Sequence, residues 1–332
     1  MTSAIRTSGG AQHASILGVG VYRPSRIVTN AEICEHIDSS DEWIRTRSGI
    51  VSRRWATPEE TVASMSVAAG GKALASAGIQ ADQVDCVLVS TVSHFSQTPA
   101  IATTIASEIG TDGAAAMDIS AACAGFCYGV ELAQSMVRGG SATYVLVIGV
   151  ERLSDLTDLK DRSTAFLFGD GAGAVVVGPS EEPGIGPVVW GSDGGAADLI
   201  RQKAPWDDAL SSGEYPYLVM QGNPVFRWAS YAMAKVAEEA LERAGVSIAD
   251  LDAFIPHQAN MRITDAMVKA LKLPSHVAIA RDIAEQGNTS AASIPLAMER
   301  MLAAGEVKSG DTALIIGFGA GLVYAAQVIR VP

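Results

Sequence analysis

Apolar residues in this chain gather in short, nearly continuous runs separated by amphipathic stretches. The runs are CVLVSTV (86–92), YVLVIGV (144–150), GAVVVG (173–178) and TALIIGFG (312–319). Each run is short and rich in β-branched residues, which predicts a strand covered on both faces. Between the runs, stretches such as 231–244 repeat apolar residues at helical spacing. The pattern therefore predicts an α/β protein with buried mixed or parallel sheets.

The chain also repeats itself. ALASAGIQADQVD (73–85) and ALERAGVSIADLD (240–252) align without a gap at an offset of 167 residues and match at five of thirteen positions. Another apolar strand follows each segment, so we interpret the two as a duplication. We expect a leader over 1–14, one half over 15–178 and a second half over 179–332. The same offset maps Cys123 onto Ser290.

Composition narrows the class of protein. The 332 residues carry a net charge of −12, which argues against a nucleic-acid-binding protein because such proteins need a basic face. No apolar run reaches the roughly 18 residues of a transmembrane helix, so no membrane association is expected. The first residues lack the apolar core of a signal peptide and suggest a flexible leader. Four cysteines in a chain of this length predict no disulfide framework, which favours the cytoplasm.

Cys123 is the first candidate for chemistry. It lies in DISAACAGF (118–126), among residues with almost no side chain, after a predicted strand end and before a helical pattern. Small neighbours leave room for a substrate or for another stretch of backbone. A helix N-terminus favours a thiolate and lowers the pKa of the thiol. The alternative is an inert core cysteine, which is how we interpret Cys127, one turn further on.

His257, Asn288 and two glycine-rich segments are the other candidates. His257 ends the apolar run of DAFIPHQAN, where α/β proteins often place site residues, and His94 is its main competitor. Asn288 lies in EQGNTSAASIP, where it either caps the next helix or faces a site. GFGAGLVYA (317–325) lacks the spacing of a nucleotide-binding loop, but its backbone N–H groups suit an oxyanion. GDGAGAVVV (169–177) is interpreted as a structural turn.

Together these motifs resemble one family. DISAACAGF with Cys123, IPHQAN with His257, GNTSAAS with Asn288 and the FGAG turn are similar to the β-ketoacyl-acyl carrier protein synthase III family. SSDEWIRTRSGI (39–50) and DRSTAFLFGDGAGA (161–174) match the same family, and the likeness is strongest to its actinobacterial members. The resemblance covers nearly the whole chain after the leader. It implies a thiolase-like fold, in which two duplicated α/β halves pack buried mixed sheets in layers.

The resemblance also implies a reaction. Cys123 would attack an acyl-CoA and form an acyl-enzyme. His257 and Asn288 would stabilise the enolate formed when malonyl-acyl carrier protein loses carbon dioxide, and this carbanion would attack the acyl group. Backbone N–H groups of Cys123 and Ala320, a position usually occupied by Gly, would form the oxyanion hole. The product is a 3-oxoacyl-acyl carrier protein that initiates fatty-acid synthesis, with no metal or other cofactor.

Further roles follow from the resemblance position by position. Trp43 and Arg47 match the residues that hold the adenine end of CoA, with Arg162 on the other side. The other CoA-tunnel positions are Ser39, Phe226, Asn260 and Arg262. Arg227, Arg262, Lys269 and Lys272 would form a basic patch for the acidic carrier protein.

The family members are homodimers, in which a loop of one subunit closes the acyl pocket of its partner. HFSQTPAI (94–101) matches this loop, with Thr98 at the pocket position. Threonine is smaller than the aromatic residue of some relatives, so we expect a pocket that accepts branched or longer acyl groups.

Several alternatives share parts of these motifs. A papain-like protease also uses Cys, His and Asn in this order, but its Cys lies near the N-terminus of the mature protein. A chalcone-synthase-like enzyme uses the same three residues in other contexts. The alternative function that these motifs leave open is a starter-unit synthase of a polyketide pathway, or a related acyltransferase with the same acyl-Cys intermediate. The segment 203–220 has little periodicity, and its role stays open.

Overall fold

The computed structural model describes residue 5 and residues 7–332. The remainder of the predicted leader, residues 1–4 and 6, lies outside the described residues. Ser8 Oγ donates a hydrogen bond to Gly139 O (2.7 Å), and the Ala11 N–H donates to Val137 O (3.2 Å). Strand β1 then begins at His13. The expectation of a loose leader is therefore wrong for residues 8–14, because this segment packs against helix α5 (Gly125–Gly139).

The first sheet belongs to the first half of the chain. Its strand order is β1-β7-β6-β4-β5. β6, β4 and β5 run parallel, whereas β7 is antiparallel to both β1 and β6. The strands are β1 (His13–Tyr22), β4 (Cys86–Ser90), β5 (Ala115–Ile119), β6 (Val145–Arg152) and β7 (Asp170–Ser180). β7 includes all of the GDGAGA segment except its first glycine, so the turn predicted there is wrong: Gly171 and Gly173 lie in a strand that passes close to helix α10 (Ser293–Ala304).

The second sheet repeats this arrangement with later residues. Its order is β12-β11-β13-β14-β8, with β12, β11 and β13 parallel and the other pairs antiparallel. The strands are β8 (Val189–Gly191), β11 (Ala253–Pro256), β12 (Ala278–Ile279), β13 (Thr312–Gly319) and β14 (Val323–Arg330). β13 has the bounds of the predicted run. The mixed sheets predicted from the apolar runs are therefore confirmed.

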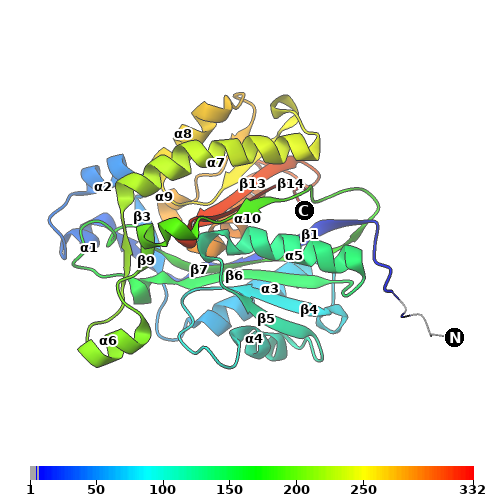
Figure 1. Cartoon of the computed structure of the whole chain (residues 1–332), viewed down its shortest axis with the longest axis horizontal. Coiled ribbons are helices and arrows are strands. Elements are labelled where there is room, and N and C mark those ends of the chain that lie inside the picture. Colours follow the sequence, from blue (N-terminus) through cyan, green and yellow to red (C-terminus); the bar gives the residue numbers. More distant parts are fainter. Residues whose placement is uncertain (1–4, 6) are drawn as a thin grey trace.

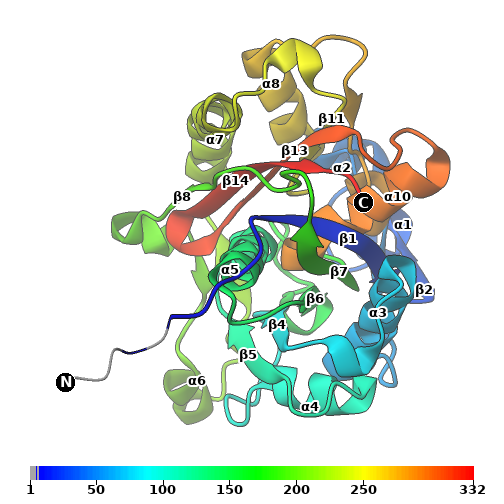
Figure 2. The same cartoon turned by 90° about the vertical axis from the view of Figure 1, so that its right-hand side faces the viewer.

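Helices separate and cover the two sheets. α3 (Val62–Ala77) and α4 (Ile101–Ile109) cover the outer face of the first sheet, and α7 (Gly222–Ala244) and α8 (Met261–Leu271) cover the outer face of the second. α5 and α10 (Ser293–Ala304) lie between the sheets, which completes five layers (Figures 1 and 2). α7 begins nine residues before the predicted helical stretch at 231. Among the described helices, none has the length and apolar character needed to cross a membrane.

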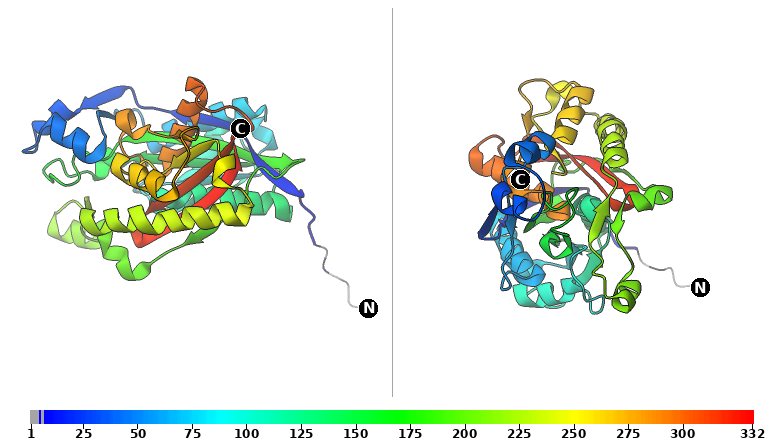
Figure 3. Two further views of the ribbon diagram at one scale, coloured as in Figure 1. Left: turned by 90° about the horizontal axis from the view of Figure 1, so that it is seen from above. Right: turned by 90° about the vertical axis from the view of Figure 1, so that its left-hand side faces the viewer.

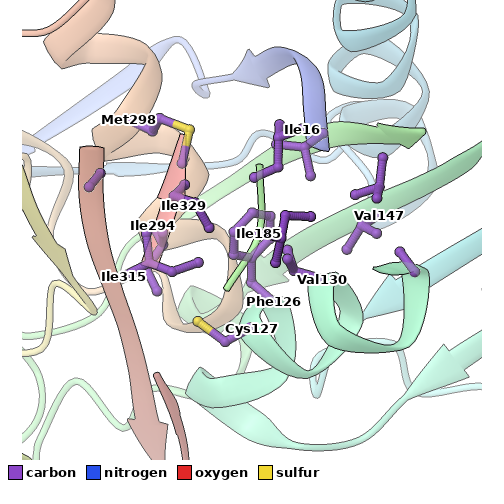
Figure 4. Packing of buried hydrophobic residues seen from close by; sticks show 14 of the residues in the cluster. Ile16, Phe126, Cys127, Val130, Val147, Ile185, Ile294, Met298, Ile315 and Ile329 are labelled. Carbon is purple, nitrogen blue, oxygen red and sulfur yellow. The ribbon is translucent and has the colours of Figure 1, made fainter. Parts of the chain in front are cut away.

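The middle layer is the largest core of the molecule. Phe126 and Val130 of α5 and Met298 of α10 are at most 1% exposed. They pack between Val147 of the first sheet and Ile315 of the second (Figure 4). Burying a large apolar side chain contributes roughly 1.5–3 kcal/mol, so this layer binds the two halves firmly.

A smaller cluster closes one end of the layers. It contains β2 (Arg26–Thr29), β3 (Ser52–Trp55), α1 (Asn30–Cys34) and α2 (Asp41–Ser48), packed on residues 165–168 (Figure 3). Arg53 is fully buried here and donates to Val28 O, Asn30 Oδ1 and Phe166 O. α9 (Ile283–Gln286) lies against β3, and its Ile283 belongs to the same cluster.

The segment 203–220 forms a protruding unit. α6 (Trp206–Ser212) lies between β9 (Ile200–Gln202) and β10 (Leu218–Met220), which pair with each other (Figure 1). Trp206 packs on Phe95 with ring centroids 5.2 Å apart, so the unit touches the 94–101 loop.

The duplication is visible in the element order and is confirmed, but one correspondence needs correction. Two 3₁₀ turns open the middle helices: the Cys turn (Ala122–Ala124) before α5 and the Ser turn (Ser290–Ala292) before α10. Ala122 and Ser290 open these turns at φ 43° and 47°. The structure therefore pairs Cys123 with Ala291. The prediction that Cys123 corresponds to Ser290 is wrong by one residue, because the offset grows from 167 to 168 before these helices.

Candidate active site

One pocket gathers residues from both halves. It has a volume of about 270 Å³ and is lined by Cys123 from the Cys turn and by His257, Asn288, Phe318 and Gly319 from the second half. A larger hollow of about 690 Å³ around Ser180–Gly186 contains none of the candidate residues. His94 lies outside both pockets. The three predicted reactive side chains thus meet at one site.

The Cys turn lies close against the end of β13. A Cβ added at Gly319 would lie 2.9 Å from the Cys123 backbone nitrogen and 3.0 Å from Sγ. A Cβ at Gly317 would lie 2.8 Å from Ala124 Cα. Contacts this short exclude any side chain, so the backbone of the second half can approach the thiol only through glycine. The small residues around Cys123 serve this close approach.

Burial dominates the titration of the thiol. Cys123 is half-buried, and desolvation raises the pKa of its thiol to about 12. The Ser290 hydroxyl lowers this pKa, and the nearby Glu151 carboxylate raises it. Desolvation is thus the largest influence on the pKa of this thiol in the free protein, and it opposes the lowering predicted from the helix N-terminus. Cys127 is fully buried in the middle layer, as its packing interpretation requires.

His257 is held rigidly at the end of β11. Its backbone N–H donates to Ile316 O (2.8 Å), and its ring lies edge-on to Phe318 with centroids 5.4 Å apart. Nδ1 and Ser293 Oγ are 2.8 Å apart, and Ser293 Oγ also accepts the Gln258 N–H. Ser293 can then donate its proton to Nδ1, which leaves the ring proton on Nε2. Burial lowers the pKa of His257 to about 3, so the imidazole stays neutral.

Asn288 combines the two functions that the sequence left open. Its Oδ1 accepts the Ser290 N–H (2.9 Å), which caps the Ser turn. Its backbone bonds to Leu167 O and to the Gly169 N–H, and the side chain lines the pocket. Because the amide oxygen is occupied, the Nδ2 amino group is the part of Asn288 that remains for a ligand.

Ala320 follows Gly319 at the turn between β13 and β14 and does not itself line the pocket. Its neighbour Gly319 does, and Gly319 touches Cys123. The predicted backbone donor thus lies one residue beyond the contact between the two halves.

The residues predicted to bind the adenine end form an aromatic and cationic cluster. The guanidinium of Arg162 lies 4.9 Å from the ring centroid of Trp43, and that of Arg47 lies 5.8 Å away. Trp43 packs edge-on against Phe166 at 5.5 Å. Arg47 lines the pocket, whereas Trp43 and Arg162 lie outside its lining.

The other predicted tunnel positions divide between the pocket and its surroundings. Phe226, Asn260 and Arg262 line the pocket, and the Arg262 guanidinium lies 5.0 Å from the centroid of the Phe226 ring. Asn260 caps α8 and donates to Arg47 O (3.1 Å), which links two of the predicted CoA contacts. Ser39 is outside the lining, and its buried hydroxyl has no hydrogen-bond partner among the described residues.

Of the predicted docking residues, only Arg262 lines the same pocket, and Arg227 follows the lining residue Phe226. Arg227 on α7 and Arg262 and Lys269 on α8 are exposed, as is Lys272 at the end of α8. Arg262 and Lys269 are seven residues apart and therefore share one face of the helix. Thr98, in the loop before α4, is exposed in the single chain.

Sequence reasoning missed several residues at this site. Ser293 orients His257, Phe318 and Trp228 shape the apolar wall, and Ile200 and Met220 bring the protruding unit to the pocket. Glu151, fully buried at the end of β6, is a further omission. The sequence could have indicated Glu151, because it is a charged residue directly after the apolar run 144–150. Among the described residues, no three His, Cys, Asp or Glu side chains gather in a way that could hold a metal ion.

Comparisons with known proteins point to one family. Residues 117–194 match the model of "3-Oxoacyl-[acyl-carrier-protein (ACP)] synthase III", and residues 241–331 match the model of its C-terminal part. The chain is 66% identical to the β-ketoacyl-[acyl-carrier-protein] synthase III 1 of Streptomyces coelicolor, over 99% of this chain and 100% of the other.

Solved structures agree with this match. The priming β-ketosynthase of the R1128 polyketide biosynthetic pathway superposes with a TM-score of 0.97 at 49% identity, over 99% of each chain. The 3-oxoacyl-[acyl-carrier-protein] synthase III of Aquifex aeolicus superposes with a TM-score of 0.89 at 38% identity, over 96% of this chain and 99% of the other. The thiolase-like fold expected from the sequence is confirmed.

Proposed function

The chain belongs to the β-ketoacyl-[acyl-carrier-protein] synthase III family, and from this premise we propose how its pocket performs the family's condensation. The reaction joins an acyl-CoA primer to malonyl-acyl carrier protein, with loss of carbon dioxide, and initiates fatty-acid synthesis. One observation carries the assignment of residues: Cys123, His257 and Asn288, which are far apart in sequence, line a single pocket.

The first half-reaction is acyl transfer to Cys123. The sulfur attacks the thioester carbonyl, the bond to the CoA sulfur breaks, and an acyl-enzyme remains. Backbone N–H groups of Cys123 and Ala320 stabilise the negative oxygen of the tetrahedral intermediate. The contact between Gly319 and Cys123 supports this assignment, because it brings the β13 turn to the sulfur. A backbone donor needs no particular side chain, so Ala at position 320 is compatible.

The second half-reaction is decarboxylation and condensation. His257 donates from Nε2 and Asn288 from Nδ2 to the thioester oxygen of the malonyl group, so the enolate is stabilised as carbon dioxide leaves. A neutral imidazole is needed for this hydrogen bond, and the burial of His257 supplies it. The enolate carbon then attacks the acyl group on Cys123 and releases the 3-oxoacyl product.

Arginine and aromatic side chains bind the CoA moiety in this proposal. The adenine stacks at Trp43 between Arg47 and Arg162, while Ser39, Phe226, Asn260 and Arg262 border the path toward Cys123. The cation–π pairs at Trp43 and Phe226 support this path, because they hold the guanidinium groups near the pocket mouth. The proposal requires no metal or other cofactor, and acyl-CoA is a substrate.

The carrier protein and a second copy of the chain are the proposed protein partners. Arg227, Arg262 and Lys269 offer positive charge beside the pocket of a chain whose net charge is −12. A homodimer is supported by β5, which forms one edge of the first sheet and leaves Met117 40% exposed. Thr98 would then reach the partner's acyl pocket. Four free cysteines support a reducing, cytoplasmic location.

Intact-protein mass spectrometry tests the assignment directly. The protein is mixed with acetyl-, propionyl-, isobutyryl- and butyryl-CoA, beside the Cys123→Ala variant and the matched control Cys34→Ala. We expect an adduct with the mass of one acyl group in the wild type and the control, and none in Cys123→Ala. The absence of an adduct from every CoA, with the protein folded, would contradict the CoA-primed reaction.

A second candidate is supported by one observation. The likeness to the priming β-ketosynthase of a polyketide pathway, at a TM-score of 0.97, favours a starter-unit synthase that uses the same acyl-Cys intermediate. The two functions differ in the acceptor. Condensation rates with malonyl-loaded carrier proteins of fatty-acid and of polyketide type distinguish them, and a strong preference for the polyketide carrier would overturn the first proposal.

A further inference from the structure

Several buried polar atoms close to the Cys turn or the Ser turn have no hydrogen-bond partner among the described residues. Within residue 5 and residues 7–332, Glu151 Oε1 and the hydroxyls of Ser90, Thr289 and Ser290 are buried without a hydrogen bond. Glu151 is fully buried, and Ser290 is 2% exposed. An unsatisfied buried polar group costs about 1–3 kcal/mol, so a cluster of them beside a reactive thiol calls for a functional reason.

Glu151 is anchored through only one of its oxygens. Oε2 accepts hydrogen bonds from Ser93 Oγ (2.6 Å), the Val92 N–H (3.1 Å) and Thr91 Oγ1 (3.3 Å). Oε1 accepts none from the described residues. The carboxyl group is thus fixed in position with one oxygen left available.

Glu151, which carries this free oxygen, lies on strand β6, and β6 contacts the Ser turn. A Cβ added at Gly149 of β6 would lie 2.2 Å from Ala291 O, so β6 and the Ser turn are in backbone contact. Glu151 is two residues further along β6 and therefore points to the same face. Ser290 is close enough to lower the pKa of both the Cys123 thiol and the Glu151 carboxyl. Neither contact has the geometry of an ordinary hydrogen bond in the free protein, and such contacts often tighten when substrate binds.

The acylation step needs an acceptor for the thiol proton. His257 is a poor acceptor, because burial lowers its pKa to about 3 and Nδ1 is occupied by Ser293. Burial raises the pKa of Glu151 to about 7, which suits proton transfer near neutral pH. Near this end of β6, the Glu151 carboxylate raises the pKa of the Cys123 thiol, and Asp170 lies opposite Arg152 in the β6–β7 ladder. Asp170 is bonded to Ser154 and to the Ala56 N–H.

We propose that Ser290 and Glu151 form a proton relay for the Cys123 thiol, an inference that rests on the acyl transfer proposed above. As sulfur bonds to the acyl carbon, the thiol proton moves to Ser290 Oγ and the hydroxyl proton of Ser290 moves to Glu151 Oε1. The electron pair of the broken thioester bond leaves on the CoA sulfur, which takes a proton from solvent. When condensation releases the Cys123 thiolate, the relay returns its proton in the opposite direction.

Rapid-quench mass spectrometry of single-turnover acylation tests the relay. Acylation by the best acyl-CoA is measured from pH 6 to 9 for the wild type, Ser290→Ala, Glu151→Gln and the control Thr289→Val. Thr289 has the neighbouring buried hydroxyl without a partner, so its loss reports on packing alone. Alanine fits the backbone at position 290, because Ala122 occupies the corresponding place in the Cys turn at φ 43°.

The relay predicts a specific pattern. Ser290→Ala and Glu151→Gln should slow acylation by about 100-fold, the lower end of the range for general acid–base catalysis, and should lose the wild type's rise in rate through about pH 7. Alkylation of Cys123 by iodoacetamide should show the same altered pH profile. Decarboxylation of malonyl-acyl carrier protein should stay within about twofold, because it needs no thiol proton transfer.

Two outcomes overturn the relay. One is acylation at the wild-type rate and pH profile in Ser290→Ala; the other is equal slowing in Thr289→Val. If Glu151→Gln fails to fold, Ser290→Ala still decides the question. A wild-type protein that forms no acyl-enzyme from any CoA would instead contradict the proposed function.

Discussion

The Cys turn and the Ser turn occupy equivalent places in the two halves and have nearly the same backbone. Both open a middle-layer helix, and both begin with a non-glycine residue at positive φ, Ala122 at 43° and Ser290 at 47°. Their chemistry differs. The Cys turn presents a thiol, whereas the Ser turn presents a hydroxyl beside Asn288 and leads into Ser293, which orients His257.

The difference shows how a duplicated fold can build one site from two copies of one turn. Each turn needs small residues, because the halves meet there at backbone distance: Gly319 lies against Cys123, and Gly149 lies against Ala291. This close contact leaves only a few positions in each turn where the side chains of the two halves can differ. In the proposed mechanism, one half places a nucleophile in this space and the other places hydrogen-bond donors.

The largest expected effects come from replacing the reactive side chain at each turn, which is Cys123 in the Cys turn and Asn288 beside the Ser turn. Cys123→Ala should abolish acyl-enzyme formation but retain decarboxylation of malonyl-acyl carrier protein. Asn288→Asp replaces the Nδ2 donor with an acceptor, so it should reduce decarboxylation by about 10²–10³-fold and leave acylation largely intact. Mass spectrometry measures the first activity, and release of labelled carbon dioxide measures the second.

Cys127→Ala is the control for the thiol, since Cys127 lies one turn away and is fully buried. It should form the acyl-enzyme normally. If Cys123→Ala and Asn288→Asp lose both activities to the same extent, the division of labour between the two turns is incorrect.

The next effect comes from the backbone contact between the halves. In Gly319→Ala, the new methyl group would approach the Cys123 sulfur to 3.0 Å. We expect a loss of about 1–3 kcal/mol in the free energy of unfolding and acylation slowed by up to about 100-fold, because the thiol is displaced. Gly71→Ala is the control: it lies in α3 with open space around it and should stabilise the protein by roughly 0.5–1 kcal/mol. Equal behaviour of the two variants would show that the contact is unimportant.

The two halves should also respond to pH with opposite signs. Burial lowers the pKa of His257 from 6.5 to about 3, so the unfolded chain binds the additional proton and stability falls as the pH drops from 6.5 toward 3. Burial raises the pKa of Glu151 from 4.5 to about 7, so the folded protein binds the additional proton and stability falls as the pH rises from 4.5 to 7. Each unit of pKa shift corresponds to about 1.4 kcal/mol, which makes both effects on the order of a few kcal/mol.

Urea unfolding at pH 4.5, 6 and 7.5 measures these contributions. His257→Gln should weaken the loss of stability toward acid, and Glu151→Gln should weaken the loss between pH 4.5 and 7. Asp170, with a pKa raised by burial to about 6, adds to the second trend in every variant. Unchanged slopes in both variants would show that other groups control the pH dependence.

The smallest effect concerns the acyl pocket, to which the 94–101 loop of a partner subunit contributes in our proposal. Thr98→Phe should shift acylation toward acetyl-CoA and against isobutyryl-CoA by about tenfold, because the larger ring fills space in the partner's pocket. Gln97→Ala, in the same exposed loop, should leave the ratio unchanged. A wild-type protein with a strict preference for acetyl-CoA would already contradict the roomier pocket expected from Thr98.

Sequence reasoning reached the main elements and brought the candidate residues Cys123, His257 and Asn288 to one pocket, but it did not reach the alignment of the two halves. The run 312–319 became β13 with the same bounds, since eight consecutive apolar or small residues fit a strand buried on both faces. The first strand was missed, although β1 alternates buried and half-buried positions from His13, because its beginning resembles a polar leader. The correspondence of Cys123 with Ser290 failed by one residue. The sequence cannot fix this spacing, because the tripeptide SAA that the two segments share, at 120–122 and 290–292, aligns at an offset of 170, which the structure does not use.

By itself the sequence determined the α/β class, the duplication and the three candidate residues of the site, because these depend on local periodicity and on motifs. Only the tertiary structure decided what surrounds each reactive group. The high pKa of Cys123, the neutral ring of His257 and the free oxygen of Glu151 all depend on desolvation and on neighbours far away in the chain. These contributions exist only after the two halves have packed, so they cannot be deduced from the order of residues.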